Sequence, residues 1–154
     1  GGEWSYNRPG FRVDEELFVR MAQVSVFFPM MQFSWAPWRV LSPEHLAIVR
    51  ECANLHARLA PELYDLIQAS AKSGEPILRP LCYSYPHAGY EKVTDEYLCG
   101  ENLLVFPVVT KGTRRKELIF PAGEWVDEDG NRYTEGRHTV ETPLEKLAWF
   151  RRKE

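Results

Sequence analysis

Apolar residues recur with two different periods along this chain, and the period changes near Gly74. Before Gly74 they fall three and four positions apart, which predicts amphipathic helices at about residues 14–27 and 43–72. Beyond residue 76 apolar and polar residues tend to alternate, which predicts short strands. We therefore expect a helical half of about 75 residues followed by an all-β half.

The two predicted helices have recognisable start and stop signals. Asp14 is a suitable cap for the first helix. The second begins at Ser42, with Pro43 in its first turn, and we expect it to kink or split at Pro61. Gly74 is expected to end it in a left-handed conformation.

The segment between the two helices predicts a β-to-α unit. Residues 28–33 are apolar and bulky, which indicates a buried strand, and residues 34–41 form a loop before the second helix. A (β/α)8 barrel is built from such units. In a barrel this loop lies at the C-terminal face, where functional sites form.

The all-β half is divided by turn signals. Residues 103–110 form an apolar run, and the stretch 116–136 predicts short strands separated by turns at Pro121–Gly123 and Asp127–Asn131. The second of these has the composition of a calcium loop but lacks the distant glutamate that would complete one. A hairpin turn is therefore the preferred interpretation.

Composition limits the classes of partner. The chain has 154 residues, 44% of them hydrophobic, and a net charge of −3. Its basic residues do not cluster, apart from those at Lys111–Lys116 and Arg151–Lys153, so a nucleic acid is not expected as a partner. No apolar run approaches the length of a membrane span, so a membrane is not expected either. Three cysteines do not suggest a disulfide framework. The chain opens on Gly-Gly without a methionine or a targeting segment, so we expect a fragment of a longer protein and predict no compartment.

Few residues suggest a reactive centre. Cys52 and His56 are four positions apart on a predicted helix, a spacing at which two side chains can bind one metal ion. No second Cys or His pair at matching spacing completes such a site, so Cys52 is better explained as a small buried residue. The sequence has no G-x-S-x-G elbow, and its carboxylates are scattered. We predict no metal site, no cofactor and no catalytic residue within the chain.

The loop at residues 34–41 carries the strongest candidate for binding. Trp35 and Trp38 could cover the end of the core, with Arg39 capping a carbonyl or pairing with an acid. Alternatively, their flat aromatic faces could pack on sugar rings, while Ser34 and Arg39 donate hydrogen bonds to hydroxyls. Spacing alone leaves both interpretations open.

Four stretches of the chain match motifs that occur in the same order in a known enzyme family. DEELFVRMAQVSVFFPMMQFS is similar to a helix E-L-Y-x-R-W-x-Q that leads into F-x-P-x-M, and LHARLAPELYDLIQASAKSGEPILRPL to R-x-x-L-x-P-Y-L-Y followed by G-x-P-x-x-R-P-L. DEYLCGENLLVFPVV is similar to D-x-Q-F-x-x-G-x-x-L-L-V-A-P-V, and ELIFPAGEWVDEDG to Y-L-P-x-G-x-W. Together they resemble glycoside hydrolase family 31 over nearly the whole chain.

The resemblance implies a fold and an activity. Residues 1–75 would be the C-terminal fragment of a (β/α)8 catalytic barrel, and residues 76–154 the antiparallel β-sandwich domain that follows it. The family hydrolyses α-glycosides with retention, using two aspartates as nucleophile and acid/base. Both would lie upstream of this chain, which would supply only the last barrel loop of the sugar site.

The sequence departs from the family pattern at two places. Many members have R-N-H-S after F-x-P-x-M, whereas Ser34 takes the place of that histidine here. Gly2 or Glu3 falls where an aromatic residue is usual, and the resemblance would bring Glu3 within reach of a sugar hydroxyl. The run MQFSWAPWR resembles a branch with M-Q-F-S and P-P-W-R that is associated with α-galactoside chemistry.

The resemblance thus predicts a substrate and a set of contacts. The substrate would be an α-linked carbohydrate, bound by Glu3, Ser34, Trp35, Trp38 and Arg39. The other expected partner is the remainder of the parent barrel, and without it the apolar segment 28–33 favours self-association. A non-catalytic carbohydrate-binding or scaffold module and a protein-interaction module are the alternative functions.

Overall fold

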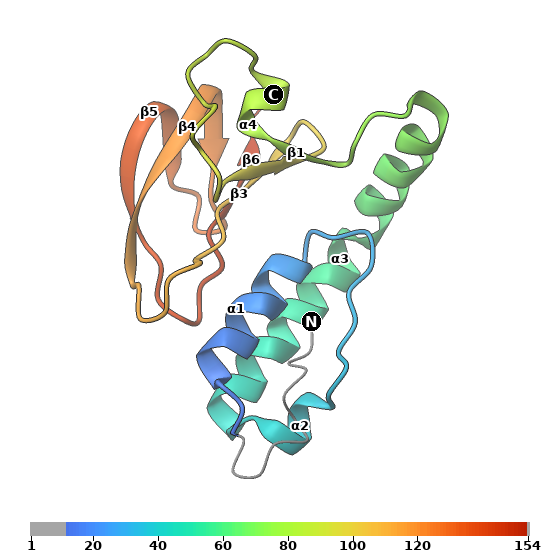
Figure 1. Cartoon of the computed structure of the whole chain (residues 1–154), viewed down its shortest axis with the longest axis vertical. Coiled ribbons are helices and arrows are strands. Elements are labelled where there is room, and N and C mark those ends of the chain that lie inside the picture. The colour runs from blue at the N-terminus through green and yellow to red at the C-terminus, as the bar shows by residue number, and fades with distance from the viewer. Residues whose placement is uncertain (1–11, 154) are drawn as a thin grey trace. The chain divides into compact units, whose positions relative to one another are not determined.

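The computed structural model describes residues 12–153 (Figure 1). The chain forms two compact units, Gly1–Tyr64 and Asp65–Glu154, and the boundary between them falls within the longest helix. In chain order the elements are α1 (Glu15–Ser25), α2 (Pro37–Val40), α3 (Pro43–Ser73), β1 (Leu78–Pro80), α4 (Leu81–Ser84), β2 (Tyr97–Cys99), β3 (Leu103–Val105), β4 (Arg115–Val126), β5 (Arg132–Glu141) and β6 (Trp149–Arg152).

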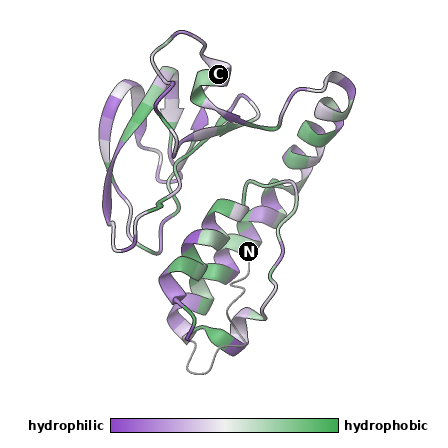
Figure 2. Ribbon diagram, in the orientation of Figure 1, coloured by the Kyte–Doolittle hydropathy of each residue, from purple (hydrophilic) through white to green (hydrophobic). Residues whose placement is uncertain are grey.

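Helices α1 and α3 confirm the two helices predicted from periodicity. The Asp14 carboxylate accepts a hydrogen bond from the Leu17 N–H at 3.2 Å, so it caps α1 as expected. At the other end of α3, Gly74 has φ of 80° and its N–H donates to the Ser70 carbonyl at 2.8 Å. Figure 2 shows hydrophobic residues recurring between hydrophilic ones along both helices.

Of the two outcomes expected at Pro61, a kink or a split, the split is wrong, because α3 is one helix of 31 residues with Pro61 inside it. A proline removes one backbone N–H and crowds the preceding turn. Leu59 and Leu63 on either side of it are 6% and 2% exposed, and burial of these side chains offsets the lost hydrogen bond.

In the first unit, α1 runs parallel to the first part of α3 (Figure 1). Two contacts fix this arrangement, and each joins residues 30 positions apart: Glu15 Oε2 lies 2.5 Å from His45 Nδ1, and His56 Nδ1 donates to the Val26 carbonyl at 2.8 Å. The start of α1 therefore meets the start of α3. Buried apolar side chains lie on both helices, namely Val19, Ala22, Ile48, Val49, Cys52, Leu55 and Leu59.

The prediction of a strand at residues 28–33 is wrong. Residues 26–29 form turns and bends, and residues 30–33 have no regular structure. A strand needs a neighbour to bond its backbone groups, and the described part of the first unit contains no other strand. The Phe33 ring stacks instead on Phe18, with centroids 6.0 Å apart and an interplanar angle of 4°.

The second unit contains one antiparallel sheet of six strands, in the order β1-β2-β3-β6-β4-β5. The switch to β structure after Gly74 is confirmed. Its described part contains, besides the end of α3, only the four-residue helix α4. The core of this unit consists of Leu81, Leu98, Leu104, Phe106, Leu118, Phe120, Trp125, Val140, Ala148 and Phe150.

One of the two turns predicted in the β half is present. Asp127 Oδ1 accepts hydrogen bonds from the N–H groups of Asp129 and Asn131, at 3.0 and 2.9 Å, which forms the hairpin turn between β4 and β5. The predicted turn at Pro121–Gly123 is wrong, because β4 continues through it with a register irregularity between Phe120 and Glu124. A β-bulge accommodates extra residues, here two on β4 relative to β5, without ending the strand.

Candidate functional site

The loop that the sequence singled out is mostly a single helical turn. Pro37 opens α2 after Ala36, and this position suits a proline because it needs no N–H donor. The Arg39 N–H donates to the Ala36 carbonyl at 2.9 Å, and the Leu41 N–H to the Pro37 carbonyl at 3.0 Å. Neither α2 nor α4 was predicted, since four residues give no periodic signal.

The structure places the predicted site residues on or just before α2. Ser34 and Trp35 lie in the bend that precedes it, and Trp38 and Arg39 lie on it. Ser34 and Arg39 are exposed, Trp35 is half-buried, and the Trp38 side chain is 71% exposed. Glu3 lies outside the described residues. A tryptophan this exposed does not cover a core within the described unit.

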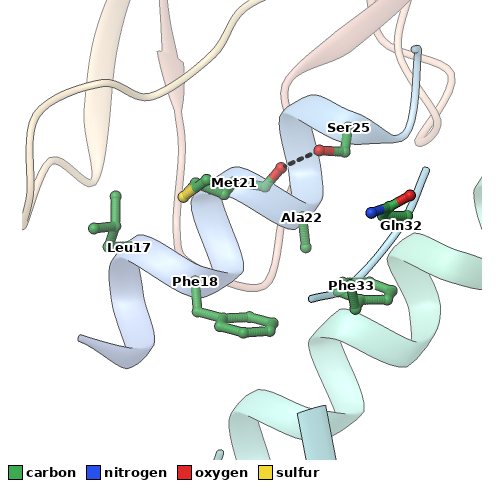
Figure 3. Close-up of a pocket in the computed structure, with 7 residues that line it drawn as sticks. All are labelled: Leu17, Phe18, Met21, Ala22, Ser25, Gln32 and Phe33. Carbon is green, nitrogen blue, oxygen red and sulfur yellow. Dashed lines mark hydrogen bonds between the residues drawn. The ribbon is translucent and has the colours of Figure 1, made fainter. Parts of the chain in front are cut away.

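A pocket lies beside this loop, between α1 and residues 32–33 (Figure 3). Its walls are mainly apolar, and the Ser25 hydroxyl donates to the Met21 carbonyl at 2.9 Å. The lining residues are Leu17, Phe18, Met21, Ala22, Ser25, Gln32 and Phe33. Without an ionisable side chain in its lining, this pocket can accept an apolar group but cannot supply acid or base catalysis.

A polar cluster at the start of α3 was not predicted. Glu15 Oε2 accepts hydrogen bonds from the Ser42 hydroxyl at 2.6 Å and from the Ser42 N–H at 2.9 Å, and it contacts His45 Nδ1 at 2.5 Å. The Ser42 hydroxyl also accepts a long hydrogen bond, 3.4 Å, from the His45 N–H. Glu15 belongs to α1 and the other two residues to the start of α3, so the cluster joins two helices.

This cluster is a capping box whose carboxylate comes from another helix. In a usual capping box, the third residue after Ser is a glutamate that accepts from the backbone N–H of the cap. Here His45 holds that position, and Glu15 accepts from Ser42 instead. The only local sequence signal for this cluster is the pattern Ser-x-x-His at residues 42–45. Its carboxylate, Glu15, lies 27 residues before Ser42, so no short motif could reveal it.

The Glu15 carboxylate is strongly stabilised in its charged form. Hydrogen bonds from the Ser42 hydroxyl, the Ser42 N–H and His45 lower the pKa of Glu15 from 4.5 to about 2. Glu15 is therefore ionised at neutral pH and cannot serve as a general acid there. Because the pKa is lowered on folding, its contribution to stability is complete above pH 4.5 and is lost as the pH falls toward 2.

We expect Glu15→Gln to lower the free energy of unfolding by about 1–2 kcal/mol at neutral pH, since the charge-assisted hydrogen bonds weaken but the side chain remains partly solvated. This free energy can be measured by urea unfolding, monitored through the far-ultraviolet circular dichroism of the helices. The difference from the unmodified chain should shrink as the pH falls below 4.5.

A matched control for this change is Glu51→Gln. Glu51 is an exposed acid on α3 that accepts a hydrogen bond from Asn54 at 3.2 Å. This variant should leave the unfolding free energy within about 0.5 kcal/mol of the original. An equal loss in both variants would show that the Glu15 cluster has no special role.

The other sequence candidates have structural explanations. Cys52 is buried, and His56 donates to the Val26 carbonyl at 2.8 Å, so their i, i+4 spacing serves helix packing. Among residues 12–153, no group of three or more His, Cys, Asp or Glu is arranged to hold a metal ion. The helices in this part of the chain are also too short or too polar to cross a membrane.

Comparison with known proteins gives a consistent result. The family model for the glycosyl hydrolase family 31 C-terminal domain matches residues 74–154. Myogenesis-regulating glycosidase of Mus musculus is 38% identical over 114 residues, which are 73% of this chain and 16% of that protein. Alpha-glucosidase 2 of Bacillus thermoamyloliquefaciens is 31% identical over 159 residues, 97% of this chain and 19% of that protein.

A solved structure extends the match to both units. A family 31 dextranase of Flavobacterium johnsoniae, solved in complex with glucose, has a TM-score of 0.82 and 33% sequence identity. The similarity covers 90% of this chain and 18% of the dextranase. The chain thus spans less than a fifth of the length of each of these three proteins.

Proposed function

The chain belongs to glycoside hydrolase family 31, and on that premise we propose that it is the C-terminal part of a retaining α-glycosidase. In this proposal residues 1–75 complete a (β/α)8 barrel, and residues 76–154 form the β-sandwich domain that follows it. The parent enzyme removes terminal α-linked sugars, an α-galactoside or a related sugar, and the rest of the barrel is the partner of this chain.

The packing of α1 and α3 supports the barrel assignment. Two consecutive helices can pack side by side in parallel only if the chain returns along their length between them. Residues 26–42 make this return, as Figure 1 shows. In a (β/α)8 barrel the returning segment is a strand that pairs with its neighbours on both sides. Residues 28–33 have the apolar composition of such a strand and would acquire those neighbours in the parent.

The exposure of Trp38 is the observation that carries the site assignment. Its side chain is 71% exposed on α2, immediately after the returning segment, where a barrel would place a loop of its C-terminal face. Ser34 and Arg39 are also exposed and can donate hydrogen bonds to sugar hydroxyls. An aromatic wall with flanking donors is the usual composition of a sugar subsite.

The proposed division of labour leaves the chemistry to the upstream part of the parent. Retaining hydrolysis needs a nucleophile and an acid/base, and the family pattern places both aspartates before Gly1. The loop of this chain would orient the sugar. The serine at position 34, in place of the histidine that many members have, supports an α-galactoside or related substrate over a glucoside.

Substitutions in the parent enzyme test this function. We expect Trp38→Ala and Ser34→Ala each to lower kcat/KM for the preferred α-glycoside roughly 5- to 150-fold. This corresponds to a loss of about 1–3 kcal/mol of transition-state stabilisation. The β domain should stay folded, as judged by its near-ultraviolet spectrum. Steady-state assays on p-nitrophenyl α-galactoside, α-glucoside and α-xyloside measure the effect.

Tyr64→Ala is the matched control, because Tyr64 is a comparably exposed aromatic residue, 61% exposed, on α3. It should leave kcat/KM within about twofold of the parent. If Trp38→Ala and Ser34→Ala retain full activity on every substrate tested, the loop at residues 34–39 has only a structural role.

A further inference from the structure

The second unit contains a polar pocket that is separate from the loop at residues 34–39. It lies where β1, α4, β2 and β6 meet, and all its lining residues belong to the second unit. Leu98, 2% exposed, is its apolar member. The others are polar or aromatic: Arg79, Ser84, Tyr85, Glu101 and Arg152. Nothing in the proposed glycosidase chemistry uses these residues.

The two arginines have spare hydrogen-bonding capacity. Arg79 donates from Nε to the Pro76 carbonyl at 2.7 Å and lies 3.5 Å from Glu101 through Nη1. Arg152 makes one long hydrogen bond, 3.4 Å, to the Ala122 carbonyl. A guanidinium has five N–H donors in a planar fork, so each arginine retains several donors for a ligand.

One hydroxyl group in the pocket has no hydrogen-bond partner among the described residues. Ser84 Oγ is buried and has no hydrogen-bond partner among residues 12–153. A buried hydroxyl without a partner costs free energy, and a bound polar group would remove that cost. The Tyr85 ring is half-buried, and burial raises the pKa of its phenol, while the charge of Arg152, which lines the same pocket, lowers it.

The charge of the pocket selects the kind of ligand. The lining contains two guanidinium groups and one carboxylate, Glu101, whose side chain is 79% exposed and lies 3.5 Å from Arg79. The remaining positive charge, the spare N–H donors and the buried hydroxyl all favour a compact group with several acceptor oxygens. We propose that this pocket binds a small oxyanion, a phosphate or carboxylate group, held by Arg79, Ser84 and Arg152.

Glu101 has a distinct role in this proposal, because it competes with the ligand for Arg79. Removal of its charge should therefore strengthen binding, whereas removal of either arginine should weaken it. A pocket whose residues only stabilise the fold would not show effects of opposite sign. This difference makes the proposal testable apart from the glycosidase function.

Calorimetric titration of the 154-residue chain with inorganic phosphate, at constant ionic strength and neutral pH, is the direct test. We expect saturable binding that Arg152→Gln or Arg79→Gln weakens about tenfold or more and Ser84→Ala weakens severalfold. Glu101→Gln should tighten it severalfold. Glucose 6-phosphate and glucose, titrated in parallel, distinguish a free oxyanion from the acid group of a charged sugar.

Arg115→Gln is the control, since Arg115 lies on β4, is 70% exposed and pairs with Glu141 at 3.0 Å. It should leave phosphate binding unchanged. Absence of saturable binding to both phosphate and glucose 6-phosphate would overturn the proposal, as would an equal loss in the Arg115 variant. Because Glu101 is at the surface, Glu101→Gln keeps the test valid even if an arginine variant misfolds. Unchanged affinity in that variant would also contradict the proposal.

Discussion

The 154 residues by themselves are expected to hydrolyse no α-glycoside. Retaining hydrolysis needs two carboxyl groups about 5–5.5 Å apart, one to attack the sugar and one to protonate the leaving group. In the proposed barrel, the acids near the rim that carries the candidate loop are Glu3, Asp14, Glu15, Glu16 and Glu44. Of these acids, only Glu3 is expected to reach the sugar, and one carboxylate cannot act both as nucleophile and as acid/base.

The structure assigns other work to several of these acids. Asp14 caps α1 through its hydrogen bond to Leu17, and the Glu15 carboxylate accepts hydrogen bonds from Ser42. The pKa of Glu15, about 2, leaves it without a proton to donate at neutral pH. Glu44 is exposed in the first turn of α3, where a negative charge favours the helix dipole.

The assay is direct. The purified chain, freed rigorously of host enzymes, is incubated with p-nitrophenyl α-galactoside, α-glucoside and α-xyloside, and release of nitrophenol is followed. We expect no turnover above that of a heat-denatured sample. Turnover that remains after removal of host enzymes, and that is lost in the Glu3→Gln variant, would show that the catalytic acids lie within this chain.

Replacement of Glu96 should have the largest effect on stability. The Glu96 side chain is 5% exposed, its Oε1 accepts from the Ile119 N–H at 3.1 Å, and its Oε2 is buried without a hydrogen-bond partner in the described chain. Burial, opposed by the Ile119 N–H and by Lys116, raises the pKa of Glu96 from 4.5 to about 7. Lys116 itself pairs with Asp95 at 2.7 Å, so it is shared between two acids.

The sign of the pH dependence follows from this raised pKa. The folded state holds the proton more tightly than the unfolded state, so the stability due to Glu96 is complete below pH 4.5 and is lost as the pH rises to about 7. The full loss corresponds to about 3 kcal/mol. Aligned on Gly100, the family motif D-x-Q-F-x-x-G has a neutral glutamine at the position of Glu96.

We therefore expect Glu96→Gln to raise the free energy of unfolding by about 2–3 kcal/mol near pH 8 and to change it little near pH 4. Denaturant unfolding across this pH range, followed by near-ultraviolet signals of the aromatic core, measures the difference. Glu141→Gln, an exposed acid 3.0 Å from Arg115, is the control and should show no such slope. If Glu96→Gln destabilises the chain at every pH, the folded state favours the ionised form of Glu96, which contradicts the prediction.

The sequence predicted the features that depend on local patterns. Capping by Asp14, the left-handed end at Gly74 and the hairpin turn held by Asp127 all follow from short motifs. The β4 bulge was missed because Pro-Ala-Gly has the composition of a turn, while the pairing of β4 with β5 on both sides of it is a tertiary effect.

Features that join distant residues could not be predicted in the same way. The contact of Glu15 with Ser42 spans 27 residues, and only the parallel packing of α1 and α3 brings them together. The polar pocket around Arg79 and Arg152 depends on strand order, which places β6 beside β3. The strand expected at residues 28–33 depends on neighbouring strands, and the described part of the first unit contains none.

The exposed loop at residues 34–41, by contrast, has a composition that marks it as a binding candidate. Two tryptophans, a serine and an arginine between an apolar segment and a helix start suggested a binding wall, and Trp38 is indeed largely exposed. The family membership of the chain makes a sugar the best-supported proposal.

A crystal structure of the parent protein with an α-galactoside-type inhibitor bound would test the proposed sugar site most directly. We expect the barrel to close around residues 28–33 and the sugar to lie within about 4 Å of Ser34 and of Trp35 or Trp38. We also expect both catalytic aspartates to come from the part of the parent that precedes Gly1. A sugar bound elsewhere, with Trp38 buried against another part of the parent, would contradict the proposed site.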